Sequence, residues 1–285
     1  MVPTDEPTDE TIKVDDSDNG VTEQDADEVI ESATEVVEMY QKTETVEEDV
    51  EETAEDEKLD EDSPLSSSAN SKYSNVVVFL DNGHTKSTPG KCSPDKSLYE
   101  WKYNREIVCE IENELDKLGI QHWNTHKEDD WVDSAHATDS KDLVLRVRRI
   151  NSKYTEVKNK GKKAFMISVH VNAAGNGDWY NATGWCTYTT RGQNNSDKLA
   201  DCLYDAAEEV LIPLGKKLRT DKSDGDRDQE SDFYIIKKAN CVCTLSENFF
   251  MDCKTDCEWL LSEEGRKAIV KLHIEGIKKY IERYC

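Results

Sequence analysis

Three apolar runs of the sequence each end in a side chain that can bind a metal or carry a proton. The run VVVFLDNGH ends at His84, FMISVHVN carries His170 near its end, and VCTLSEN carries Glu247 near its end. Two imidazoles and a carboxylate, with water in a fourth position, form a ligand set of catalytic zinc. A lone histidine is more often a core or turn residue. The prediction of a metal site therefore depends on whether the three runs end close together.

The elements that would position these residues alternate along the chain. Strands alternating with helices are typical of α/β domains with a mostly parallel sheet. We predict a single α/β domain with a mostly parallel central sheet flanked by helices on both faces. The predicted strands are 75–81, 120–126, 163–171, 184–190, 231–238 and 240–247, and the predicted helices are 99–119, 142–161, 196–214 and 263–285.

Local signals set the ends of these elements. Gly119 and Gly161 follow helical apolar patterns and are predicted to end two helices, because glycine readily adopts the left-handed conformation of a helix C-terminus. Ser196 is the predicted N-cap of the third helix. Residues 127–141 and the segment TKSTPGKCSPDKSL after His84 are predicted loops that frame a substrate groove.

Ligands of open α/β sheets bind beyond the carboxyl ends of the strands. If the strands that end near His84, His170 and Glu247 are parallel neighbours, two imidazoles and a carboxylate converge at one edge of the sheet. This convergence explains why a buried strand would end by placing a histidine at its tip.

Charge divides the chain into two parts. The whole chain has a formal charge of −25, and residues 1–70 hold 26 acidic residues against 3 lysines, so the remainder is close to neutral. A segment this acidic and this poor in apolar residues cannot offset its ordering entropy by burial. We predict a disordered acidic tail and linker over 1–72, in which 27–40 could form a transient helix, and a catalytic domain over 73–285.

Composition and motifs exclude several classes of function. The sequence has neither a GxGxxG nor a GK[ST] phosphate loop, and no basic patch that would indicate nucleic-acid binding. No apolar run approaches the roughly 18 residues that span a bilayer, which predicts no membrane insertion. The first residues show neither a basic nor an apolar segment, so we expect no secretory signal, and we expect the nine cysteines to be free thiols in a reducing compartment. We expect a monomer.

Five motifs in order resemble the zinc-dependent N-acetylmuramoyl-L-alanine amidases of the amidase-3 type, which occur in bacteria and in phage endolysins. The resemblance covers about 75–283. It departs from the family pattern at Asn82, where the family usually has proline, and at Phe249, where it often has glycine. The matching residues are Asp81-Asn82-Gly83-His84, Glu100 with Asn104, Arg146 with Asn151, Ser168-Val169-His170-Val171-Asn172-Ala173, and Glu247-Asn248-Phe249-Phe250.

The resemblance implies that one zinc ion per chain is held by His84, Glu100 and His170, and that Glu247 is the general base and acid. Spacing alone does not choose Glu100 over Glu106 as the third ligand, because both lie on the helix predicted over 99–119. Glu106 is the alternative, although it could simply form a surface ion pair.

The implied reaction is hydrolysis of the amide between N-acetylmuramic acid and L-alanine in bacterial peptidoglycan, which lyses the cell wall. Asp81 is expected to orient a ligand histidine, and Asn172 to support the loop after His170 or to touch substrate. Without an export signal, we predict a phage endolysin that stays in the cytoplasm of the infected bacterial cell until a membrane-permeabilising partner releases it.

Three alternatives stay open. The chain could be a zinc hydrolase of another amide or peptide on the same fold. It could carry a structural zinc site, because the spacing C-x-C-x9-C-x3-C loosely resembles a four-cysteine site. It could also be a non-catalytic protein that binds partners through its acidic tail. The cysteines are Cys241, Cys243, Cys253 and Cys257, and the remaining histidines are predicted to be structural (His122, His126) or on the surface (His136, His273).

Overall fold

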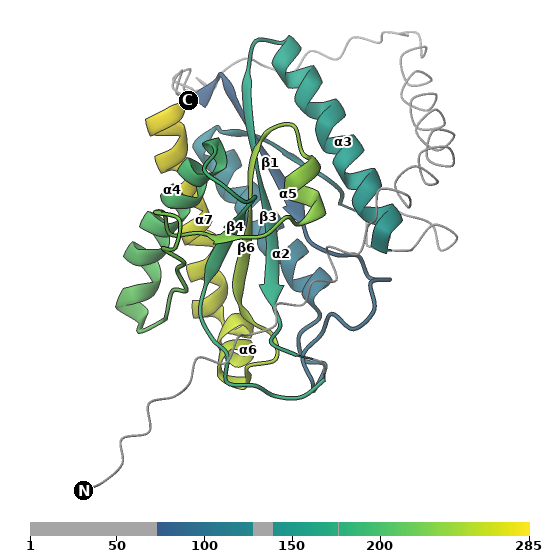
Figure 1. The fold of residues 1–285 in the computed structure, drawn as a ribbon, viewed down its shortest axis with the longest axis vertical. Helices are drawn as coiled ribbons and strands as arrows, with labels where there is room; N and C mark the ends of the chain where they lie inside the picture. Colours follow the sequence, from purple (N-terminus) through teal and green to yellow (C-terminus); the bar gives the residue numbers. More distant parts are fainter. Residues whose placement is uncertain (1–72, 128–138, 176) are drawn as a thin grey trace, which may run out of the picture.

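The computed structural model describes residues 73–127, 139–175 and 177–285, which fold into an α/β domain (Figure 1). The predicted tail over 1–72, its transient helix and His136 lie outside the described residues. In the described part of the chain, no helix is both long enough and apolar enough to cross a membrane.

A central sheet runs through the domain with the strand order β2-β1-β3-β6-β4-β5. Strands β1, β2, β3 and β6 pair in parallel, β4 pairs antiparallel to β6, and the short β5 pairs in parallel with β4. The prediction of a mostly parallel sheet is confirmed. The strands are β1 (Val76–Asn82), β2 (Gln121–Asn124), β3 (Lys163–Asn172), β4 (Cys186–Thr189), β5 (Gln229–Glu230) and β6 (Val242–Phe250).

Helices cover both faces of this sheet, as predicted. Helices α2, α4 and α7 pack together on one face, and α3 and α5 lie on the other (Figure 1). Helix α6 lies at the end of the molecule toward which β3 points (Figure 1). The helices are α2 (Glu100–Leu118), α3 (Asp139–Asn159), α4 (Asn195–Leu211), α5 (Tyr234–Lys238), α6 (Lys254–Leu261) and α7 (Glu263–Tyr284), with a 3-10 turn at Ile212–Leu214.

Alternation along the strands divides the core into two halves. In β3, Phe165 and Ile167 belong to the cluster with α2 and α7, whereas Met166 faces the cluster with α3 and α5. This period of two is the expected pattern of a strand buried on both faces. Gly119 ends α2 in the left-handed conformation, with φ of +67°, as its sequence position predicted.

Two predicted elements differ in the structure. Residues 231–238 were predicted to form a strand, but Tyr234–Lys238 form the helical turn α5, which buries Ile235 and Ile236. A short apolar run does not distinguish a strand from one turn of helix. The N-cap of α4 is Asn194 rather than Ser196, because the Asn194 side chain accepts from the Ser196 N–H and Asp197 completes a capping box.

The prediction that His273 lies on the surface is wrong. It is fully buried in α7, where its Nδ1 lies 2.8 Å from the Ile269 carbonyl oxygen and its Nε2 lies 2.9 Å from the Ser246 hydroxyl. A carbonyl can only accept, so Nδ1 carries the proton and Nε2 accepts from Ser246. Burial lowers the pKa of His273 to about 4, which keeps the ring neutral.

Candidate metal centre

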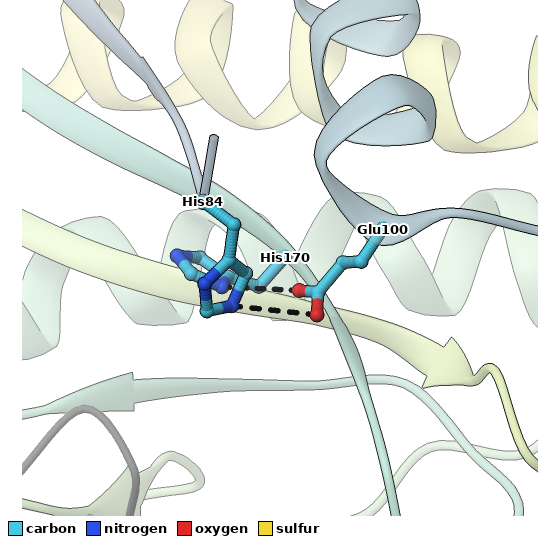
Figure 2. Close-up of side chains that lie close together, drawn as sticks. All are labelled: His84, Glu100 and His170. Atoms are coloured by element: carbon cyan, nitrogen blue, oxygen red, sulfur yellow. Dashed lines mark hydrogen bonds and ion pairs between the residues drawn. The ribbon is translucent and has the colours of Figure 1, made fainter. Parts of the chain in front are cut away.

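The structure brings the ends of β1, β3 and β6 to one edge of the sheet, because these strands are parallel neighbours in the order β1-β3-β6. His84 follows the end of β1, His170 lies near the end of β3, and Glu247 lies in β6. Glu100, in the first turn of α2, reaches the same edge (Figure 2). The carboxyl ends of the three strands therefore meet as predicted, and the carboxylate grouped with the two histidines is that of Glu100.

The spacing of these donor atoms suits a zinc ion. His84 Nε2 lies 3.3 Å from Glu100 Oε2, and His170 Nδ1 lies 3.2 Å from Glu100 Oε1 (Figure 2). One donor atom from each of the three residues lies within 4.8 Å of the other two. Two ligands bound tetrahedrally at about 2.0–2.1 Å are roughly 3.3 Å apart, so nitrogen and oxygen donors at these separations fit the ion.

Glu100, rather than Glu106, is the carboxylate at this site. Glu106 lies further along α2 and pairs with Arg266 at 2.7 Å, so the expected surface ion pair is present. The Glu100 carboxylate accepts from the Val171 N–H at 2.9 Å and from the Asn104 amide at 3.3 Å. The spacing of four residues puts Asn104 one helical turn beyond Glu100, from where it can hold the carboxylate in place.

The charge of Glu100 also suits a metal ligand. Its carboxylate is buried, which opposes ionisation, but His84 and His170 outweigh burial and lower the pKa of Glu100 to about 2. The N-terminal turn of α2 adds the positive end of the helix dipole. The carboxylate is therefore anionic at neutral pH, the form in which it binds a metal.

Gly83 has no side chain because the His170 ring occupies the space. A Cβ added to Gly83 would lie 2.2 Å from His170 Cε1 and 2.3 Å from its Nε2. The backbone of Gly83 is itself fixed, since its N–H donates to the Val169 carbonyl at 3.0 Å and its carbonyl accepts from Asn104. The glycine before the histidine thus allows one candidate ligand to lie over the strand end that carries the other.

The backbone of His84 is held in an unfavourable conformation by Arg146. His84 has a φ of +64°, in the left-handed region that side chains other than glycine seldom adopt. Arg146, buried in α3, donates to the His84 carbonyl at 2.8 Å and to the Asn82 carbonyl at 2.7 Å. Backbone strain of this kind persists only where surrounding contacts enforce it.

Asp81 and Asp142 balance the charge of Arg146. Arg146 donates to Asp81 at 3.0 Å and to Asp142 at 2.8 Å, and Asp81 also accepts from Ser168 and Thr125. Burial would raise the pKa of Asp81, but Arg146 and these hydroxyls hold it well below its usual range. Asp81 therefore helps to hold Arg146, and its role in orienting a ligand histidine stays a prediction.

His126 belongs to this network and not to the metal centre, in line with its predicted structural role. Its Nε2 lies 3.1 Å from the Asn82 amide nitrogen and 3.4 Å from the Arg146 guanidinium. Both neighbours are donors, so Nε2 must accept and the ring is neutral. Burial and the charge of Arg146 lower the pKa of His126 to about 2.

Glu247 lies on the strand next to His170, and its side chain shares one face of the sheet with that histidine. It is the register partner of His170 in β3 and of Cys186 in β4. The pairing of β3 with β6 becomes irregular directly after this point, where Phe249 adopts a φ of +65°. The left-handed conformation gives a physical reason why the family often has glycine at this position.

Asparagines support the strand ends around His170. Asn172 accepts from the Ala173 N–H at 2.8 Å, at the start of the loop that follows β3. Asn248 donates to the His170 carbonyl at 2.8 Å and accepts from the Trp185 indole at 3.0 Å. Local patterns did not single out Asn248, because its partners lie in β3 and directly before β4.

The four-cysteine alternative receives no support from the described residues. The groups of metal-binding side chains found there are His84 with Glu100 and His170, and a set of three aspartates. All nine cysteines are free, and Cys241 and Cys243 are buried near the start of β6. His122, the other histidine predicted to be structural, pairs with Glu112 and Asp116 at the surface.

Comparisons with known proteins identify the family and the fold of the chain. Residues 78–279 match the amidase-3 family model, which is described as N-acetylmuramoyl-L-alanine amidase. No curated protein matches the chain.

Solved structures share the fold at low sequence identity. An N-acetylmuramoyl-L-alanine amidase from Clostridium difficile 630 is 22% identical with a TM-score of 0.57, over 74% of this chain and 100% of that one. The amidase AmiC2 of Nostoc punctiforme is 20% identical with a TM-score of 0.57, over 73% and 98%. The catalytic domain of CwlV from Bacillus (Paenibacillus) polymyxa var. colistinus is 18% identical with a TM-score of 0.55, over 72% and 98%.

Proposed function

The chain belongs to the N-acetylmuramoyl-L-alanine amidase family, and from this membership we propose that it uses a zinc ion to hydrolyse the amide between N-acetylmuramic acid and L-alanine. The observation that carries the proposal is the arrangement of His84, Glu100 and His170, whose donor atoms lie within 4.8 Å of one another. Two imidazoles and an anionic carboxylate form a donor set that zinc prefers, and they leave a position open for water.

The residues divide into ligands and a proton carrier. His84, Glu100 and His170 would hold the ion, and Asn104 keeps Glu100 oriented toward both histidines. When bound, zinc supplies a Lewis acid that activates water and polarises the scissile carbonyl. Arg146 serves the site indirectly, because it holds the backbone of His84.

Glu247 is the group that moves the proton. It accepts a proton from the attacking water and returns it to the amine nitrogen of L-alanine as the C–N bond breaks. The products are the lactyl carboxylate of the sugar and a peptide with a free N-terminal alanine. The support for this role is the position of Glu247 as the register partner of His170 at the carboxyl edge of the sheet.

The test separates the proton carrier from the ligands. Glu247→Gln keeps the size of the side chain but cannot take a proton, so it should retain zinc and lose at least about 100-fold in activity. Glu100→Gln should lose zinc as well. Glu106→Gln is the matched control on the same helix as Glu100, since Glu106 faces Arg266, and it should retain both zinc and activity. Wild-type activity in Glu247→Gln would contradict the proposed role.

The competing proposal is a zinc hydrolase that acts on another amide or peptide on the same fold. The metal centre supports the chemistry of amide hydrolysis more directly than it supports one substrate. Digestion of purified peptidoglycan separates the two, because the proposed bond yields new N-terminal alanine. Cleavage that yields another N-terminus would favour the competitor.

We extend the proposal to lysis of the cell wall by a phage endolysin held in the cytoplasm of the infected cell. The support for this extension is the family's substrate class, since cleavage of this bond degrades the bacterial cell wall. Expression inside a bacterial host with and without a membrane-permeabilising partner tests it. Lysis that needs the partner is the expected result, and lysis without it would point to export by another route.

A further inference from the structure

A second group of acidic side chains lies beside β5, the outermost strand of the sheet, away from the candidate zinc ligands. Asp197 lies in the first turn of α4, and Asp226 and Asp228 lie in the segment that leads into β5. One carboxylate oxygen from each of the three lies within 4.8 Å of the other two. We call these three aspartates the acidic-edge site.

Burial makes this grouping unfavourable unless a positive charge joins it. Asp228 is only 2% exposed, and although its Oδ2 accepts from the Thr189 hydroxyl at 2.6 Å, its Oδ1 is buried without a hydrogen-bond partner. Asp226 Oδ1 is buried without a partner as well. Buried carboxylate oxygens that lack both a donor and a counter-charge are strongly destabilising.

Arg227, which separates Asp226 from Asp228 in the sequence, forms its ion pairs with other acidic residues. Arg227 pairs with Asp201 at 2.9 Å, with Asp205 at 2.8 Å and with Glu208 at 3.2 Å, all on α4. Its guanidinium therefore balances the charge of these acidic side chains on α4, and not that of Asp226 or Asp228. The acidic-edge site needs either a proton shared between its oxygens or a bound cation.

The donor chemistry favours a hard cation. All three side chains of the acidic-edge site offer oxygen, with neither imidazole nor thiolate in the set. Oxygen-only sites suit Ca²⁺, whose bonds of about 2.3–2.6 Å place opposite ligands up to about 5 Å apart. Mg²⁺ demands a tighter octahedron, with bonds of about 2.0–2.1 Å, and dehydrates reluctantly, so it is seldom held by protein carboxylates alone.

We propose that Asp197, Asp226 and Asp228 form a Ca²⁺ site that fixes the edge of the sheet, separate from the zinc centre. The ion would tie the first turn of α4 to the segment before β5, next to Thr189 at the end of β4. Strand β4 in turn pairs with β6 beside Glu247. The role is structural and does not depend on the proposed amide chemistry.

A shared proton is the competing explanation, and it predicts different behaviour. Burial raises the pKa of Asp228 to about 7, with further increase from Asp226 and Asp197. With a shared proton, lowering the pH from 8 to 6 stabilises the fold and Ca²⁺ does not change the melting temperature. With a bound ion, Ca²⁺ raises the melting temperature at pH 8 and reduces this pH dependence.

The experiment measures the melting temperature of the full zinc-loaded chain in Ca²⁺-free buffer, then with added CaCl₂ or MgCl₂. Wild type should gain about 5 °C or more at a Ca²⁺ concentration about 100-fold above its Kd. Asp228→Asn should lose that gain, and Asp226→Asn, at a less buried position, provides the same test if Asp228→Asn does not fold. Asp178→Asn removes an exposed carboxylate outside the site and should respond like wild type.

Calcium bound by the acidic N-terminal residues does not confuse the comparison, because every variant keeps them. An equal response of wild type, Asp226→Asn and Asp228→Asn would overturn the site. So would the absence of a response in wild type, and an equal response to Mg²⁺ would overturn the assignment to Ca²⁺.

Discussion

Replacing Gly83 by alanine tests the close fit between the two strand ends that carry the candidate ligands. The new Cβ would lie 2.2 Å from His170 Cε1, whereas ordinary contact begins at 3.4 Å, so the ring must retreat by more than 1 Å. The backbone of Gly83 cannot easily give way, because it is hydrogen-bonded to Val169 and Asn104. Zinc sites tolerate ligand displacements of only about 0.2 Å.

The expected result is a loss of zinc with a modest loss of stability. Overpacking of this kind destabilises a fold by about 1–3 kcal/mol. Displacing a ligand should weaken zinc binding by roughly 100-fold or more, since even supporting groups contribute about 10- to 100-fold. Titration against a competing chelator measures the affinity, and denaturant unfolding measures the stability.

Gly161→Ala is the matched control. Gly161 has a φ of +72° with open space around its Cβ position, so alanine strains the backbone without a clash. It should lose about 1–2 kcal/mol of stability and keep wild-type zinc affinity. If Gly83→Ala binds zinc as tightly as Gly161→Ala, the close fit between Gly83 and the metal centre is refuted.

Three further changes follow from the contacts around the site. In Arg146→Lys, the lysine cannot make the several hydrogen bonds of the guanidinium. Unfolding measurements should therefore show a loss of about 3 kcal/mol of stability, and chelator competition should show a 10- to 100-fold weaker zinc affinity. An unchanged zinc affinity would contradict the idea that Arg146 holds His84 in place for the metal. Burial lowers the pKa of His273 from 6.5 to about 4, so the unfolded chain takes up this proton at a higher pH than the folded chain does. The free energy of unfolding should therefore fall by about 3 kcal/mol between pH 6.5 and pH 4. In His273→Gln this part of the pH dependence should be absent. Phe249→Gly and Phe249→Ala both lose the buried ring that packs on Trp259. Phe249→Gly should nevertheless be more stable by about 1 kcal/mol, because glycine adopts a φ of +65° without strain and alanine does not. A lower melting temperature for Phe249→Gly than for Phe249→Ala would contradict the backbone strain at this position.

Sequence patterns predicted those parts of the fold around the candidate site that local rules determine. Apolar runs followed by polar tips identified β1, β3 and β6, and the parallel-sheet rule placed their carboxyl ends together. Gly119 marked the end of α2 because only glycine readily adopts its conformation. These features depend on short stretches of chain, so periodicity and turn chemistry were enough to find them.

Features that depend on tertiary contacts were not predictable in this way. Glu100 and Glu106 share α2, and the structure separates them through what they face, which helical spacing alone does not specify. The burial of His273 is a different case, because this residue lies one turn from Ile269 and from Ile277 on the buried face of α7, and that local periodicity could have indicated it. The grouping of Asp197 with Asp228 joins α4 to a distant loop and has no local signature.

Zinc-dependent cleavage of the muramoyl–alanine bond is tested by a zinc count combined with N-terminal analysis of peptidoglycan digested by the full chain. We expect one zinc per chain and new N-terminal alanine, both lost on chelation and both restored by added zinc. A chain that holds its zinc but releases no alanine, or one that releases alanine at full rate after zinc removal, would contradict this expectation.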